Sequence, residues 1–230
     1  MTNTPAAATR PSRRLLPVAG AALAALLLVV LASSGGSGSG DGGAGAVDAA
    51  PAAVTVTGPL CDLLPAGSEP GNPSSLAGQP ADQALQWIPV LTTFEAAVRA
   101  TGLADELTRG VTILAPTDDA FVAMFSRTNL DELLLRDTDV LRDLLRDHLV
   151  TGVLPVSELI AAGTVTTVAG TTLTVTGRTV TGRGQTARVD EAETVCADYQ
   201  AVDARIHVID QVLGDLPSTA GEDDDGHPAH

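Results

Sequence analysis

One stretch, VTILAPTDDAF from Val111, constrains the fold most, because it sets the end of a strand directly against the start of a helix. Its branched apolar residues are typical of a buried strand. Pro116 has no amide hydrogen to give to a sheet, so we expect the strand to stop there. Thr117 or Asp118 can then cap the exposed amides of a helix that carries Phe121. The stretch therefore predicts a strand-to-helix junction with an architectural role.

The N-terminus has the pattern of an export signal. Three arginines, Arg10, Arg13 and Arg14, precede an apolar run from Leu15 to Ala32. The run is long for a signal peptide and just long enough to cross a bilayer, so residues 1–32 are either a cleaved signal peptide or a retained membrane anchor. General and twin-arginine export both stay open. Either way we expect the rest of the chain to be secreted or associated with the cell envelope, outside the cytoplasm.

The charge balance of the chain is strongly acidic. It has 28 aspartates and glutamates against 13 basic residues, all of them arginine, for a formal net charge of −15. Loss of the three N-terminal arginines brings the exported part to −18 (10 − 28). A basic face supplies most of the affinity for nucleic acid, so the charge argues against nucleic-acid binding and we expect none. The same charge argues against docking on anionic lipid, which leaves the N-terminal segment as the one expected membrane contact.

The exported part reads as one folded domain between two polar segments. Residues 33–57 are rich in Gly, Ser and Ala and have little to bury, which predicts a flexible linker. Residues 58–217 contain the apolar patterns, and they begin with a Pro- and Gly-rich arm, 58–80, that we expect to wrap on the domain. Residues 218–230 are acidic and are expected to form a disordered tail.

The order of the patterns predicts an α+β fold. Apolar residues at helical spacing indicate helices over 81–87 and 90–100, and further helices follow as far as Ile160. After Gly163 the texture changes to alternating Thr and Val with Gly turns, which is typical of short antiparallel strands. Residues 206–213, IHVIDQVL, alternate strongly enough for a central strand. Helices first and strands afterwards predict helices packed around a small antiparallel β-sandwich.

Two cysteines, Cys61 and Cys196, stand at the two ends of the region that we expect to fold. In an exported chain an even pair predicts a disulfide rather than two free thiols. The bond would close a loop of about 135 residues, which makes it a staple for the whole domain. Neither cysteine has neighbours at metal-ligand spacing, so we expect no metal site there.

Three ordered motifs resemble those of the fasciclin domain: VTILAPTDDAF, DHLVTGVL from Asp147, and IHVIDQVL from Ile206. The resemblance runs from about Trp87 to Pro217. Two flanking segments with one cysteine each, GPLCDLL and VCADYQ, further resemble the mycobacterial-type secreted immunogenic fasciclin proteins.

This resemblance implies a compact wedge of two sheets with helices around them, and an extracellular adhesion or binding role without catalysis. Asp147 stands where the family has the Tyr of a Tyr-His pair, which puts recognition of an integrin-type receptor in doubt. The motif positions, all interpreted as structural, are Pro116, Thr117, Asp118, Phe121, His148, Ile209 and Asp210.

The residues themselves offer little catalytic chemistry. A lone His148 among leucines is more often a hydrogen-bonded core residue than a catalyst, and if it is buried and neutral, acid should destabilise the fold. A hydrolase would need a nucleophile such as Ser157, which reads instead as a helix start, and no G-x-S-x-G elbow occurs. Acidic and histidine residues near the end of the chain read as a solvated tail. We therefore expect no catalytic, cofactor or metal site.

The sequence thus predicts an exported, non-catalytic module that adheres or binds through protein or glycan contacts, at the cell surface or beyond it. The alternative, from another class, is a carrier of a small apolar or lipid ligand lodged between the helices and the sheet. An enzyme is the least supported class.

Overall fold

The computed structural model describes residues 54 to 222. The expected signal or anchor (1–32), most of the linker (33–57) and the end of the acidic tail lie outside the described residues. No helix in residues 54 to 222 combines the length and the apolar character needed to cross a membrane.

Helices and strands follow one another along the described residues. The helices are α1 (Pro73–Leu76), α2 (Ala81–Leu85), α3 (Thr92–Thr101), α4 (Ala104–Leu107), α5 (Asp118–Met124), α6 (Arg127–Leu135), α7 (Thr138–Arg146) and α8 (Val156–Ala162). The strands are β1 (Val111–Pro116), β2 (Leu149–Thr151), β3 (Thr164–Thr166), β4 (Thr172–Val180), β5 (Gly184–Val189), β6 (Ala192–Ala201) and β7 (Ala204–Ile209). Two 3-10 turns, η1 (Cys61–Leu63) and η2 (Pro89–Leu91), precede α1 and α3.

The strands form one seven-stranded sheet in the order β2-β1-β7-β6-β5-β4-β3. Among these neighbours β1 and β7 run parallel and the other pairs run antiparallel. The two outer strands approach each other, since Val150 of β2 and Thr167, just after β3, form an isolated bridge. The predicted α+β fold is confirmed, and its strands make one hydrogen-bonded series that curls back on itself.

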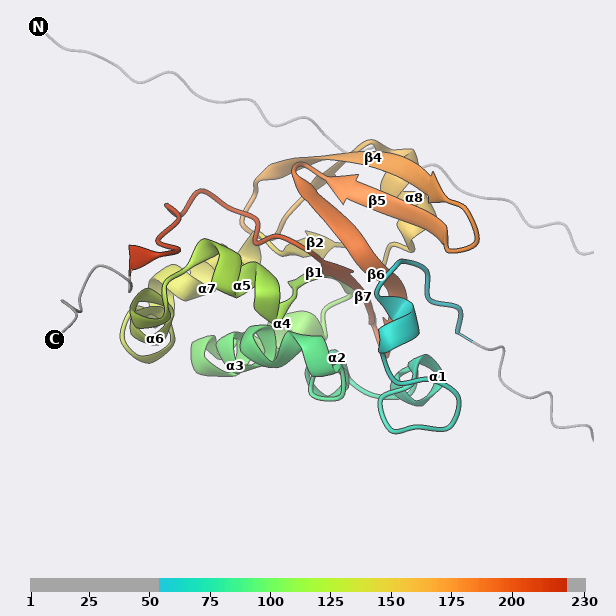
Figure 1. The fold of residues 1–230 in the computed structure, drawn as a ribbon, viewed down its shortest axis with the longest axis horizontal. Helices are drawn as coiled ribbons and strands as arrows, with labels where there is room; N and C mark the ends of the chain where they lie inside the picture. The colour runs from blue at the N-terminus through green and yellow to red at the C-terminus, as the bar shows by residue number, and fades with distance from the viewer. Residues whose placement is uncertain (1–53, 223–230) are drawn as a thin grey trace, which may run out of the picture. The chain divides into compact units, whose positions relative to one another are not determined.

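Two hydrophobic clusters lie on the two sides of the central strands. Successive side chains in a strand point to opposite faces, so Ile113 of β1 packs under the helices whereas its neighbour Leu114 packs in the other cluster. The first cluster joins α2 to α7 to the central strands, and the second joins α8 to β3, β4 and β5. Figure 1 shows α2 to α7 on one side of the fold, and β4, β5 and α8 on the other.

Pro116 lies inside β1, not beyond its end as the sequence predicted. It is in register with Ile209 of the parallel strand β7, and the next amide, Thr117 N, donates to Ile209 O at 3.0 Å. Leu114 N points to the other side of the strand and donates to His148 O, so Pro116 N, two residues on, faces that same side. Strand β2 does not reach that far. The missing amide hydrogen therefore costs no ladder bond.

The last strand is shorter than the sequence predicted. β7 ends at Ile209, whereas the alternation favoured a strand through Leu213. At Asp210 the side chain replaces the backbone as acceptor: its carboxylate accepts from Glu193 N at 2.7 Å, while its own amide still donates to Glu193 O. Residues 210–222 then run along α5 and the start of α6. We call this segment the C-terminal strap.

The packed body reaches slightly beyond both expected boundaries. Thr57, assigned above to the linker, pairs with Ala197 of β6. At the other end, Thr219 was assigned to the tail. Its amide donates to Met124 O, and its hydroxyl accepts from Ser126 N at 3.0 Å. Composition does not reveal these contacts, because each rests on a single polar residue in a polar segment.

Candidate functional site

The strand-to-helix junction after β1 is built around Asp118. Its two carboxylate oxygens accept from Thr93 N at 2.7 Å and from the Thr92 hydroxyl at 2.8 Å. These donors open helix α3, whose N-terminus has no cap from its own N-cap side chain. A carboxylate there satisfies an otherwise unpaired amide and complements the helix dipole. Asp118 thus caps α3 from α5 and ties two helices that are separated in sequence.

We expect Asp118→Ala to lower the free energy of unfolding by about 2 kcal/mol, because two charge-assisted hydrogen bonds to α3 are lost. Urea unfolding followed by circular dichroism measures this change. Asp119→Ala is the matched control, since it removes the same charge from an exposed side chain one residue later. For the control we expect a change under about 0.5 kcal/mol. Equal losses in the two variants would show that net charge, not the cap, is responsible.

The other motif positions complete the same junction. Sequence alone left either Thr117 or Asp118 as the cap of α5, and the structure assigns that cap to Thr117, whose hydroxyl accepts from Ala120 N at 3.1 Å. Phe121, on the inner face of α5, is fully buried in the first cluster. Each of these residues is engaged inside the fold.

His148 is completely buried and bonded at both ring nitrogens. Its Nδ1 donates to Leu144 O and its Nε2 accepts from Leu213 N, each at 2.9 Å. This arrangement places the ring hydrogen on Nδ1 and requires the neutral form. Burial lowers the pKa of His148 to about 4, against smaller opposing effects of the Leu144 carbonyl and of nearby Asp147. The imidazole fastens the C-terminal strap to α7 and is out of reach of a substrate.

A second buried histidine, His207 of β7, holds the loop around Leu154 in place. The sequence did not predict this contact. Its Nε2 donates to Leu154 O at 2.9 Å, and its Nδ1 accepts from Asp198 N at 3.1 Å. Burial lowers the pKa of His207, which again favours the neutral ring. Thr112 accepts from Leu154 N, and the Asp198 carboxylate accepts from Val156 N. Side chains from β1, β7 and β6 thus hold one loop in place.

Asp147, which stands where the resemblance leads one to expect an aromatic residue, has a local role. Its Oδ1 accepts from the Thr171 hydroxyl at 2.6 Å and from the Thr167 hydroxyl at 3.3 Å. Both threonines lie in the turn between β3 and β4. The carboxylate therefore links the end of α7 to the outer strands of the sheet.

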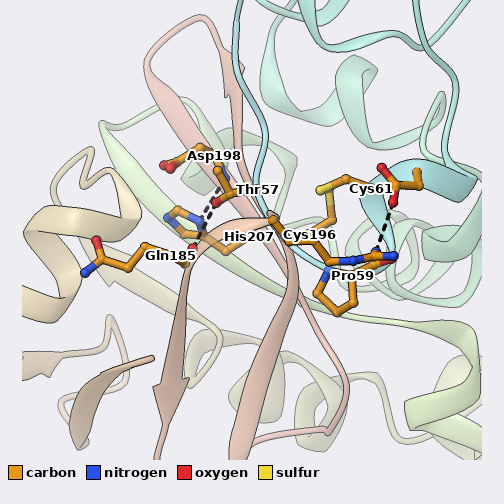
Figure 2. The surroundings of a disulfide bond; sticks show 9 residues. Thr57, Pro59, Cys61, Gln185, Cys196, Asp198 and His207 are labelled. Carbon is orange, nitrogen blue, oxygen red and sulfur yellow. Dashed lines mark hydrogen bonds and ion pairs between the residues drawn. A yellow bond between two sulfur atoms is a disulfide. The ribbon is translucent and has the colours of Figure 1, made fainter. Parts of the chain in front are cut away.

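The structure contains the predicted disulfide between Cys61 of η1 and Cys196 of β6, whose Cα atoms are 5.1 Å apart (Figure 2). Next to it, Leu60 N donates to Val195 O at 2.8 Å. Gly58 has a φ of +141°, and a Cβ at this position would lie 2.3 Å from Val195 O. Only glycine allows so close an approach of the arm to β6, which explains why this residue precedes the cysteine.

The tip of the β4–β5 hairpin also holds the arm (Figure 2). The Thr57 hydroxyl donates to Gln185 O at 2.9 Å. Arg183 donates to Pro59 O at 2.6 Å and pairs with Asp62 at 3.0 Å. The arm is therefore attached to the sheet by side-chain and backbone contacts as well as by the disulfide.

One hollow on the described surface measures about 670 Å³, lies beside α5 and α6, and is lined in part by Val122, Phe125 and Leu130. Neither Asp118 nor His148 borders it. In residues 54 to 222 no group of three or more His, Cys, Asp or Glu side chains is placed to hold a metal ion. The junction therefore has a structural role, because its side chains cap helices α3 and α5.

A model of the fasciclin domain family matches residues 89–216, more than half of the chain. The chain therefore belongs to the fasciclin domain family. Fasciclin domains are generally non-catalytic binding modules, a class that suits a junction whose Thr117 and Asp118 side chains are bonded inside the fold.

Two relatives illustrate the similarity. Protein sll1483 of the cyanobacterium Synechocystis is 32% identical over 124 residues, which cover 53% of this chain and 66% of that protein. A FAS1 domain pair from the insect cell adhesion molecule Fasciclin I is 26% identical, with a TM-score of 0.41, over 53% of this chain and 44% of that one. This chain thus spans less than two thirds of the length of either relative.

Proposed function

We propose that this protein is an exported, non-catalytic module that adheres or binds outside the cytoplasm through protein or glycan contacts. The observation that carries the proposal is the engagement of the family's motif residues inside the fold. Asp118 caps a helix, and His148 spends both ring nitrogens on backbone groups. A general base must reach the proton that it abstracts, and this imidazole is closed off. Function is then left to the outer faces of the domain.

A location outside the cytoplasm is supported by the Cys61–Cys196 disulfide, because such bonds persist in oxidising compartments. The export pattern at the N-terminus supports the same location. We also infer that the chain is of the mycobacterial-type secreted immunogenic subgroup. The covalent link between the arm and β6 supports that assignment.

Crosslinking on intact cells tests this function, and the composition of the chain makes it selective. The chain has no lysine, so a carbodiimide couples its carboxylates to amines of a partner with little coupling inside the chain. The full-length protein is expressed in a bacterium that exports it, crosslinked, and recovered for mass spectrometry. Retention on isolated cell walls reports a glycan partner in parallel. We expect the protein in the envelope or supernatant, oxidised at Cys61 and Cys196, with a reproducible partner.

An excess of untagged protein is the control for this experiment, since it should displace the tagged protein from a saturable partner. Recovery from the cytoplasm with two free thiols would contradict the exported location. Crosslinks and retention that resist the competitor would contradict specific binding.

The carrier alternative needs an apolar space between the helices and the sheet. In the described residues that region is filled by the first cluster, where Phe94, Leu141 and Ile206 are completely buried. The hollow beside α5 and α6 opens to the surface. A lipid extract of the purified full-length protein separates the two functions: a stoichiometric bound lipid would favour the carrier, and its absence would favour the adhesion module.

A further inference from the structure

The second half of the chain contains a long segment without acidic residues. Residues 159–189 include no aspartate or glutamate, although the whole chain has 28 of them. The same residues include Arg178, Arg183 and Arg188. They form the end of α8 and then β3, β4 and β5. These strands thus carry arginine and no acidic side chain in a chain with a net charge of −15, and acidic residues return on the next strand, where Glu193 of β6 lies opposite Arg188.

One face of β3, β4 and β5 is lined by threonine and arginine side chains. The cross-strand pairs on this face include Thr164–Thr174, Thr166–Thr172 and Thr176–Arg188, and Arg178 lies opposite Thr186, which is buried. Residues between them along the strands, such as Val165 and Val175, are buried in the second cluster and point to the opposite side. The exposed residues that make up this threonine–arginine face are Thr164, Thr166, Thr172, Thr174, Thr176, Arg178 and Arg188.

In the described part of the chain the neighbouring helix lies on the other side of these strands. Val156 and Leu159 of α8 belong to the second cluster, and a Cβ on Gly177, which shares a face with Val175, would lie 2.6 Å from Ile160 Cγ2. Figure 1 shows β4 and β5 at the outside of the fold, away from α2 to α7. The seven residues that define the threonine–arginine face are therefore exposed to solvent, whereas Thr186 beside them is buried.

The two arginines of this face are held loosely. Arg178 pairs with Glu193 at 3.4 Å while 72% of its side chain is exposed, and Arg188 Nε donates to Asp190 O at 3.0 Å. They occupy diagonal positions on adjacent strands, which places the two residues about 7 to 8 Å apart. An exposed ion pair of this kind contributes about 1 kcal/mol or less. Arg178 can therefore exchange Glu193 for a carboxylate from outside.

We propose that the threonine–arginine face binds a carboxylate-bearing polysaccharide, an inference that rests on the proposed binding function and names its partner. The planar guanidinium group matches the two oxygens of a carboxylate. Threonine hydroxyls on the adjoining strands donate to and accept from sugar hydroxyls. The face has no aromatic residue, so recognition here uses hydrogen bonds and charge rather than ring stacking.

The strong negative charge of the protein narrows the class of polymer. At physiological ionic strength, charges more than about 8 Å apart are largely screened, so a sparsely charged polymer responds to the local face. A densely phosphorylated polymer would extend over the acidic remainder of the surface and be repelled. A polyuronate, whose carboxylates are separated by neutral parts of each sugar, satisfies both conditions.

Affinity electrophoresis of the full-length protein tests the proposal, with polygalacturonate in the gel and its fully methyl-esterified form as the uncharged control. We expect retardation by polygalacturonate alone, weakening as salt rises. The double variant Arg178→Gln/Arg188→Gln should weaken binding by at least about tenfold. The matched variant Arg109→Gln/Arg136→Gln has the same charge change on exposed residues of the helical side, and should bind within about twofold of the wild type.

A second pair of variants acts in the opposite direction. Glu193→Gln releases Arg178 from its internal partner, so polygalacturonate should bind more tightly, whereas Glu191→Gln, with the same charge change, should have no effect. Equal losses in the two arginine pairs, or binding of the esterified polymer, an acidic protein or a polyphosphate in its place, would overturn the proposal. If the Arg178→Gln/Arg188→Gln variant is retained on isolated cell walls as strongly as the wild type, this face is refuted while the proposed function stands.

Discussion

Removal of the disulfide should lower the free energy of unfolding by up to about 5 kcal/mol, more than any single side-chain change proposed above. The bond joins residues with a sequence separation of 135, and the entropy that it removes from the unfolded chain grows with loop length. Urea unfolding of the Cys61→Ala/Cys196→Ala variant, against the oxidised wild type, measures the loss. The unfolded variant is less constrained and exposes more surface, so its m-value should rise as well.

Whether the arm stays docked without the disulfide determines if the whole domain or only the arm is destabilised. Leu60 and Thr57 keep their backbone and side-chain bonds to the sheet without the disulfide, so the arm should stay docked and the whole domain should unfold earlier. The single variant Cys61→Ala is a control that leaves Cys196 in place and should lose a similar amount. An unchanged urea midpoint, with new proteolysis only in the arm, would show that the bond stabilises the arm alone.

Acid should destabilise the fold in a pH range set by His148. Its pKa is about 4 in the folded protein and about 6.5 in the unfolded chain, so above pH 6.5 the ring is neutral in both states. As the pH falls below 6.5, His148 becomes protonated in the unfolded chain but stays neutral in the folded protein. The free energy of unfolding therefore declines until about pH 4. The contribution of His148 alone is a loss of about 2 kcal/mol at pH 5 and about 3 kcal/mol at pH 4.

His207 should act in the same direction, because protonation of either ring sets a new N–H group against a backbone N–H, that of Leu213 or of Asp198. Glu106, whose pKa the hydrogen bond from Arg146 lowers from 4.5, loses its contribution only at lower pH. Urea midpoints at pH 7.5 and pH 5 therefore report mainly on the histidines.

A glutamine in place of either histidine separates this effect from general acid denaturation. His148→Gln keeps an acceptor for Leu213 N but cannot titrate, so we expect a less stable protein at pH 7.5 with a shallower dependence on pH. His207→Gln should behave likewise. If both variants keep the full loss between pH 7.5 and pH 5, the buried histidines are not its cause.

Much of the fold could be predicted from local patterns, and the misses came from contacts between distant segments. The strand before the junction, the helices before Ile160 and the later strands each follow from the spacing of apolar residues. We expected Pro116 to end the strand because it cannot donate a hydrogen bond to a neighbouring strand. In the structure its nitrogen faces the side where β2 has already ended, so no bond is lost. Where β2 ends could not be predicted from the sequence.

The site shows the same division. Asp118 was one of two candidates for the cap of α5, but the helix that it caps is α3, which precedes it, because the two meet only in the folded domain. His207 and Asp198 gave no signal, since their partners are backbone groups of a distant loop. Asp198 also has a φ of +73°, a left-handed conformation that interrupts β6 and that alternation could not foresee.

The parallel pairing of β1 with β7 governs the moment at which the domain can fold. It joins the first long strand to the last, so the middle of the sheet stays incomplete until nearly the whole domain is available. Pairings between such distant segments form slowly, because the intervening chain must be ordered first. A nascent chain that lacks its final strand remains loose and exposes β1 to wrong partners. Stable folding of the described domain therefore depends on residues close to its C-terminal end.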